Sequence, residues 1–110
     1  MLFRSSLENK TKSETFIGFV MRTGKFRIGT NAVATLKKAN LVMVCHTASE
    51  NTKKQAEKLA KRFACPLLET KRKSLEQLTH RDNAKVMATF DKQLSEAILN
   101  NSEEDFTQRI

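Results

Sequence analysis

Two spacings of apolar residues alternate along this chain. Apolar residues three and four positions apart, as at Ala56, Leu59 and Phe63, predict helices that bury one face. Short runs of apolar residues predict strands, and the continuous run 41–45 is typical of a central strand that is covered on both faces. Helices and strands are therefore expected to follow one another along most of the chain.

Capping residues and chain breakers set the limits of these segments. Ser, Thr and Asp accept hydrogen bonds from the free N–H groups at helix starts, and glycine tolerates the left-handed backbone that ends many helices. Strands are predicted at residues 26–28, 41–45, 67–69 and 85–90. Helices are predicted from Ser13 to Gly24, from Thr30 or Asn31, from Thr47 to the Cys65–Pro66 stop, around Leu75 and Leu78, and from Asp91. This alternation predicts an α/β fold, a three-layer α/β/α sandwich around a mixed sheet of about four strands.

The chain has 110 residues, which is room for one domain with one core. We expect residues 1–13, which are polar and aperiodic, to form a flexible arm, and residues 101–110 to form a frayed tail. The folded domain is then predicted over residues 14–100. Right-handed crossovers are expected to bring the 29–31 turn and the loops at 46–50 and 70–73 to one edge of the sheet.

Basic residues outnumber acidic ones. There are 20 Lys and Arg against 12 Asp and Glu, which gives a net charge of +8 and a pI near 9.8. Residues 16–92 hold 16 basic and 6 acidic residues, so about +10 falls on this part of the chain. Many soluble domains are basic for solubility alone, but a field of this sign also attracts phosphate groups. The charge therefore favours a nucleic-acid partner.

Little in the chain indicates catalysis, a metal or a membrane. Cys45, Cys65, His46 and His80 lack the spacing of a metal site, and a Cys–His nucleophile would need an orienting group that no motif supplies. The glycines form neither a P-loop nor a dinucleotide fingerprint. With two cysteines, no leader-like apolar segment and no long apolar run, a reduced cytoplasmic protein is expected. We predict no enzyme, no cofactor, no metal and no membrane contact.

The turn at 29–31 is the candidate binding site. It opens a helix, and the unpaired N–H groups of a helix N-terminus attract phosphates and base edges. Basic residues flank it, and the 70–73 loop is expected beside it. The predicted contacts are Lys25, Arg27, Gly29, Thr30, Asn31, Lys37, Lys38, Lys71, Arg72 and Lys73. The alternative is a plain turn and cap among solvated charges.

Two further surfaces are not expected to bind. The basic outer face of the helix that begins at 47–50 is explained in part by pairs such as Glu50–Lys54, and it is predicted to point away from the site. Most of the seven Phe residues fall on predicted core positions, and the chain has no Tyr or Trp. No surface for base stacking is therefore predicted.

Several motifs occur in the order seen in a known family. The segment 22–25 (RTGK) with Gly29, the strand and helix opening within 41–63 and the segment 65–69 (CPLLE) resemble the kink-turn RNA-binding superfamily. Its members include ribosomal proteins of the L-seven-Ae and L-thirty-e type, and the small bacterial YlxQ-type homologues are the most similar. The resemblance covers residues 14–100 and implies the same α/β/α sandwich.

The family binds RNA through a G-x-N-E-x-x-K motif at the start of its second helix. Gly29 and Asn31 match this motif, whereas Ala32 replaces the Glu and Thr35 replaces the Lys. Base-edge contacts specify a sequence and phosphate contacts only position the protein, so these changes bear on kink-turn selectivity. The resemblance implies RNA binding in general.

The resemblance also implies the biological setting. It indicates a monomeric ribonucleoprotein component on or near the ribosome, with ribosomal or other structured RNA, including kink-turn RNA, as partner and ribosomal proteins as neighbours. The alternative is a protein–protein interaction module on the same fold that has lost kink-turn recognition.

Overall fold

The computed structural model describes residues 11–110. The elements are, in chain order, α2 (Lys12–Thr23), β1 (Phe26–Ile28), α3 (Thr30–Ala34), β2 (Leu41–Val44), α4 (Glu50–Phe63), β3 (Leu67–Thr70), α5 (Leu75–Thr79), β4 (Val86–Thr89), α6 (Lys92–Asn100) and β5 (Phe106–Gln108). No helix in this part of the chain is both long and apolar enough to cross a membrane.

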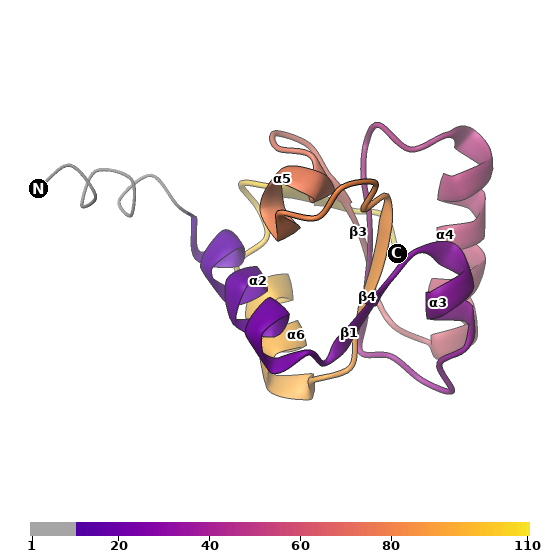
Figure 1. Cartoon of the computed structure of the whole chain (residues 1–110), viewed down its shortest axis with the longest axis horizontal. Helices are drawn as coiled ribbons and strands as arrows, with labels where there is room; N and C mark the ends of the chain where they lie inside the picture. The colour runs from indigo at the N-terminus through magenta and orange to yellow at the C-terminus, as the bar shows by residue number, and fades with distance from the viewer. Residues whose placement is uncertain (1–10) are drawn as a thin grey trace, which may run out of the picture.

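The strands form one mixed sheet with the order β1-β4-β2-β3-β5. Strands β2 and β3 are parallel, and the other neighbours are antiparallel. Helices α3 and α4 lie on one side of the sheet, and α2, α5 and α6 lie on the other (Figure 1). The predicted three-layer α/β/α sandwich is confirmed, with five strands in place of about four.

A hydrophobic core fills the space on each side of the sheet. All residues of β2 and β4 are buried, as the apolar run at 41–45 predicts for a central strand. Alternate side chains point to opposite faces. Val42 and Val44 therefore pack toward α3 and α4, and Leu41 and Met43 pack toward α2, α5 and α6.

Local signals explain where most helices begin and end. Gly24 closes α2 with φ 74°, a left-handed conformation that costs glycine little, and its N–H donates to the Val20 carbonyl. Asp91 caps α6 through the N–H of Leu94, as predicted. Helix α4 begins at Glu50 and is capped by the side chain of Ser49, two residues after the predicted cap Thr47.

Both ends of the described chain differ from the prediction. Residues 101–110 are not a frayed tail, because β5 pairs with β3 as an edge strand. Residues 11–13 are not part of an arm, because Thr11 caps α2 and Ser13 is fully buried. The buried Asp105 joins the two segments by accepting hydrogen bonds from the hydroxyls of Thr11 and Ser13. The rest of the predicted arm, residues 1–10, lies outside the described residues.

Candidate nucleic-acid interface

The three predicted loops lie at the same end of the sheet. Strands β1, β2 and β3 run in one direction, so the residues that follow them emerge together. The Gly29 N–H donates to the Val86 carbonyl at 2.8 Å, and the His46 N–H donates to the Thr70 hydroxyl at 2.9 Å. The three loops share this end of the sheet, but the 70–73 loop does not lie beside the 29–31 turn as expected, because β4 and β2 separate β1 from β3.

The turn at Gly29 is specified by its backbone. Gly29 has φ 98° and ψ 143°, a region that a residue with a Cβ rarely adopts, and no side chain caps α3. Helix α3, which the sequence predicts to attract phosphates at its N-terminus, has only five residues, so few aligned peptide dipoles support that end. Thr30 is half-buried and Asn31 is exposed.

A shallow hollow of about 230 Å³ lies between α3 and α4. Its lining residues are Thr30, Asn31, Ala34, Gln55, Lys58 and Leu59. Lys58 thus faces the turn, which corrects the expectation that the whole basic face of α4 points away. The 3.6-residue period of α4 places positions 55, 58 and 62 on one side, and this signal identifies Lys58 once α3 is known to pack there.

Arg62 on the same side of α4 holds α3 in place. Its Nη2 donates to the carbonyls of Ala34 at 2.8 Å and Leu36 at 3.1 Å, and its guanidinium lies over the Phe63 ring. A basic side chain at the last carbonyls of a helix satisfies acceptors that have no partner within the helix. Arg62 therefore has a structural role, in line with the reading of this face as helix support.

The residues that flank the turn in sequence lie toward the opposite end of the sheet. The guanidinium of Arg27 lies over the Phe90 ring, 5.3 Å from its centre, and the Lys25 carbonyl accepts the Phe90 N–H. A second hollow, of about 460 Å³, has Phe90 in its wall, and we call it the Phe90 hollow. Its lining residues are Leu36, Lys37, Lys38, Asn40, Phe90 and Lys92.

Phe90 and Lys92 were not predicted as site residues. The alternating pattern of residues 85–90 places Phe90 on a core-facing strand position, but β4 ends one residue earlier. Phe90 is half-buried, as are Phe16 and Phe26, and Phe19 is exposed. Phe63 and Phe106 are buried in the core and Phe16 and Phe26 pack against it, so the expectation that most Phe residues fall on core positions is confirmed for the described residues. Phe19 and Phe90 depart from it.

The basic loop 71–73 is joined to acidic residues instead of to the turn. Arg72 pairs with Glu104 at 2.8 Å, and Lys73 pairs with Glu14 at 2.9 Å. Lys71 is exposed, and its N–H donates to the Asp105 carbonyl. The structure thus places these three predicted contacts beside α2 and the C-terminal segment, away from α3.

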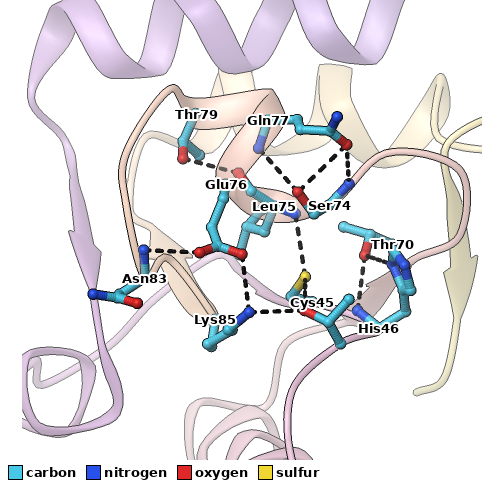
Figure 2. A network of polar contacts seen from close by, with 11 residues as sticks. Cys45, His46, Thr70, Ser74, Leu75, Glu76, Gln77, Thr79, Asn83 and Lys85 are labelled. Carbon is cyan, nitrogen blue, oxygen red and sulfur yellow. Dashed lines mark hydrogen bonds and ion pairs between the residues drawn. The ribbon is translucent and has the colours of Figure 1, made fainter.

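A polar network at the sheet end connects β2, α5 and β4 (Figure 2). The Thr47 hydroxyl lies 3.0 Å from Cys45 Sγ and accepts from Lys85 Nζ at 2.8 Å, and Lys85 also donates to Glu76 at 2.9 Å. The Leu75 N–H donates to the same sulfur at 3.4 Å. These contacts fasten α5 to the end of the sheet.

The network also sets the pKa of its ionisable groups. Burial raises the pKa of the Cys45 thiol, but hydrogen bonds with Thr47 and from the Leu75 N–H outweigh it, and the pKa is lowered. The hydrogen bond with Lys85 lowers the pKa of Glu76, and the same bond raises the pKa of Lys85. Cys45 is fully buried, and the exposed His46 turns its Nδ1 to Thr70 at 2.8 Å. In residues 11–110 no cluster of His, Cys, Asp or Glu is arranged to hold a metal ion.

The chain was compared with known proteins. No protein-family model matches it. No curated protein matches it. Its structure is similar to that of a protein with unknown function from Bacillus halodurans, with a TM-score of 0.72 and 19% sequence identity over 86% of this chain and 100% of that chain. At this identity the similarity shows the fold.

Proposed function

We propose that the protein binds structured RNA, on or near the ribosome, through one basic surface around α3. This α3 surface consists of Arg27, Asn31, Lys37, Lys38, Lys58, Phe90 and Lys92. It includes four of the contacts predicted from the sequence and extends from the hollow between α3 and α4 to the Phe90 hollow. We also propose that the protein acts as a monomer in the cytoplasm and needs no cofactor.

The observation that carries the proposal is the set of unpaired cations. Within residues 11–110, none of Arg27, Lys37, Lys38, Lys58 and Lys92 forms an ion pair with a carboxylate. All five side chains belong to exposed residues. Residues 15–49 contain no Asp or Glu at all. Cations that form no ion pair with a carboxylate attract phosphate groups, and the nucleic acid releases counterions when they bind.

The basic loop is left out of the proposed surface for the opposite reason. Arg72 and Lys73 already have carboxylate partners in Glu104 and Glu14. RNA phosphates would have to compete with these carboxylates. We therefore assign RNA binding to the α3 surface and a structural role to loop 71–73.

A gel mobility-shift titration tests the proposal directly. The RNAs are a kink-turn RNA, a plain duplex and bulk ribosomal RNA, each at about 50 mM and about 200 mM salt. We expect binding that weakens with salt, because the contacts are mainly to phosphates. Preference for the kink-turn RNA would show that other contacts replace the family's Glu and Lys at Ala32 and Thr35.

Two double variants with the same loss of charge locate the surface. Lys37→Ala with Lys38→Ala is expected to lower affinity about tenfold or more, because it removes two phosphate contacts. Arg72→Ala with Lys73→Ala is the matched control and is expected to leave affinity within about twofold, because both cations are already paired with the carboxylates of Glu104 and Glu14. Equal effects of the two double variants would contradict the assigned surface. No binding of any RNA at low salt would overturn the function and favour the protein–protein interaction module.

A further inference from the structure

Phe90 and Arg27 form a cation–π pair at the rim of the α3 surface. The guanidinium lies 5.3 Å from the ring centre, and Nη1 of Arg27 donates to the Phe26 carbonyl at 2.7 Å. This hydrogen bond fixes the guanidinium over the ring and leaves most of its five N–H donors available. A held pair of an aromatic ring and a guanidinium presents flat surfaces on which nucleobases stack.

The hollow beside this pair has the size of a small-ligand site. Its volume of about 460 Å³ falls in the range of about 300–1,000 Å³ that is usual for such sites. Leu36 and Phe90 supply apolar wall, and Lys37, Lys38 and Lys92 surround it with positive charge. Apolar surface next to several cations suits a ligand with a flat base and a phosphate.

Asn40 supplies a group that can read a base edge. It is exposed and lines the Phe90 hollow. Its backbone N–H donates to the Thr89 carbonyl at 2.8 Å, which fixes its position at the sheet end. No described residue hydrogen-bonds to its side-chain amide, which carries both donors and acceptors.

We propose that the Phe90 hollow takes one unpaired nucleotide of the bound RNA. The base stacks on the Phe90–Arg27 pair, and Lys37, Lys38 and Lys92 contact the adjoining phosphates. The inference rests on the proposed RNA binding and narrows it to RNA with a bulged or looped-out nucleotide. A base inside a duplex has both faces covered by its neighbours, whereas an unpaired base can leave the helix and enter a hollow of this size.

The test uses two hairpin RNAs that differ by one bulged nucleotide. The bulged nucleotide is 2-aminopurine, a fluorescent adenine analogue whose emission depends on stacking. The chain has no Trp and no Tyr, so the fluorescence comes from the probe alone. We expect the bulged hairpin to bind about tenfold more tightly than the paired hairpin, with a change in probe emission that follows binding.

Two single variants assign the effect to the Phe90–Arg27 pair. Phe90→Leu keeps an apolar side chain of similar bulk and loses the ring, and Arg27→Lys keeps the charge and loses the planar group. Each is expected to reduce the preference for the bulged hairpin over the paired hairpin about tenfold, whatever it does to the affinity for the paired hairpin. Phe19→Leu is the matched control, because Phe19 is exposed under Arg22 at 5.2 Å but does not line the Phe90 hollow.

The outcomes separate the inference from the function on which it rests. RNA binding that needs Lys37 and Lys38 but shows no preference for the bulge would overturn the inference alone. Absence of RNA binding would overturn both. A free mononucleotide that binds as tightly as the bulged hairpin would overturn the assignment to RNA and identify a free nucleotide as the ligand. If Phe90→Leu fails to fold, an unchanged bulge preference in Arg27→Lys still overturns the inference.

Discussion

At the scale of single residues, the two cysteines occupy opposite electrostatic settings. Cys45 receives hydrogen bonds that lower its pKa. Burial in the core beneath α4 raises the pKa of Cys65 from an ordinary 9.0 to about 11. A hydrogen bond from the Val42 backbone opposes this rise in the pKa of Cys65. A neutral thiol is favoured where hydrogen bonds compensate only in part for the water lost on burial. Cys65 therefore links the stability of the fold to pH in the alkaline range.

The sign of this link follows from which state binds the proton more tightly. Folded Cys65 holds its proton up to about pH 11, whereas the unfolded thiol loses it near pH 9.0. Its contribution is complete below pH 9.0 and is lost as the pH rises through about 11. From about pH 8 to about pH 10.5, the free energy of unfolding therefore falls by about 2 kcal/mol because of Cys65.

Urea unfolding of the parent protein and of Cys65→Ala at these two pH values tests this link. We expect the parent to lose about 2 kcal/mol more stability than the variant on going to the higher pH. Cys45 has a lowered pKa, so its contribution has the opposite sign, and it cancels because both proteins retain it. The prediction is wrong if the two proteins lose the same amount.

At the scale of elements, β5 depends on one buried carboxylate. Asp105 is 1% exposed and accepts from Ser13 Oγ at 2.8 Å and from the Thr11 hydroxyl. Its carbonyl also accepts the Lys71 N–H at 2.9 Å. The strand itself has three residues and only one buried side chain, Phe106, so these contacts hold the C-terminal segment against α2.

Replacement of Asp105 by Ala is expected to destabilise the protein by about 2–3 kcal/mol. Hydrogen bonds to a charged group contribute about 1.5–3 kcal/mol, and the hydroxyls of Thr11 and Ser13 would lose their acceptor. Glu104→Ala is the control, because its pair with Arg72 is more than half exposed and contributes at most about 1 kcal/mol. Chemical unfolding gives both values, and hydrogen exchange at Thr107 should accelerate only in the first variant. Equal destabilisation by both variants would show that the carboxylate does not hold β5.

Elements with their own local signal could be predicted from the sequence. The run 41–45 indicated a buried central strand, the apolar stripe of α4 indicated its packed face, and Asp91 indicated the start of α6. Strand β5 carries no such signal, because a three-residue strand in a polar segment is defined by its partner β3 and by Asp105. Contacts between distant parts of the chain are not encoded in local periodicity.

The candidate site was predicted in part for the same reason. Gly29 and Asn31 were identified at the start of α3, but Lys37 and Lys38 lie toward the other end of the sheet because α3 is short and the chain returns there. Phe90 could not be identified, because its place outside the core depends on where β4 ends. A basic sequence pattern predicts that the surface is positively charged, but it does not predict which basic residues lie together on it.

At the scale of the whole molecule, the sheet joins two cores. Strands β2 and β4 are buried on both faces, so residues next to each other along one strand serve different cores. Met43 belongs to the core under α2, α5 and α6, and Leu67 belongs to the core under α3 and α4. Neither core keeps its sheet face if the strands separate, so we expect both to unfold in one transition.

Hydrogen exchange in two reciprocal variants tests this coupling. Met43→Ala and Leu67→Ala each remove a fully buried side chain and are expected to cost about 2–5 kcal/mol. If the molecule unfolds cooperatively, Met43→Ala accelerates the exchange of the slowest amide protons about thirtyfold or more in α2. It accelerates the slowest amide protons of α4, on the other side of the sheet, by the same factor. Leu67→Ala has the same effect on α2. If each variant accelerates only the helices on its own side, the two cores open separately, and the α3 surface can then change its shape without disturbing α2 and β5.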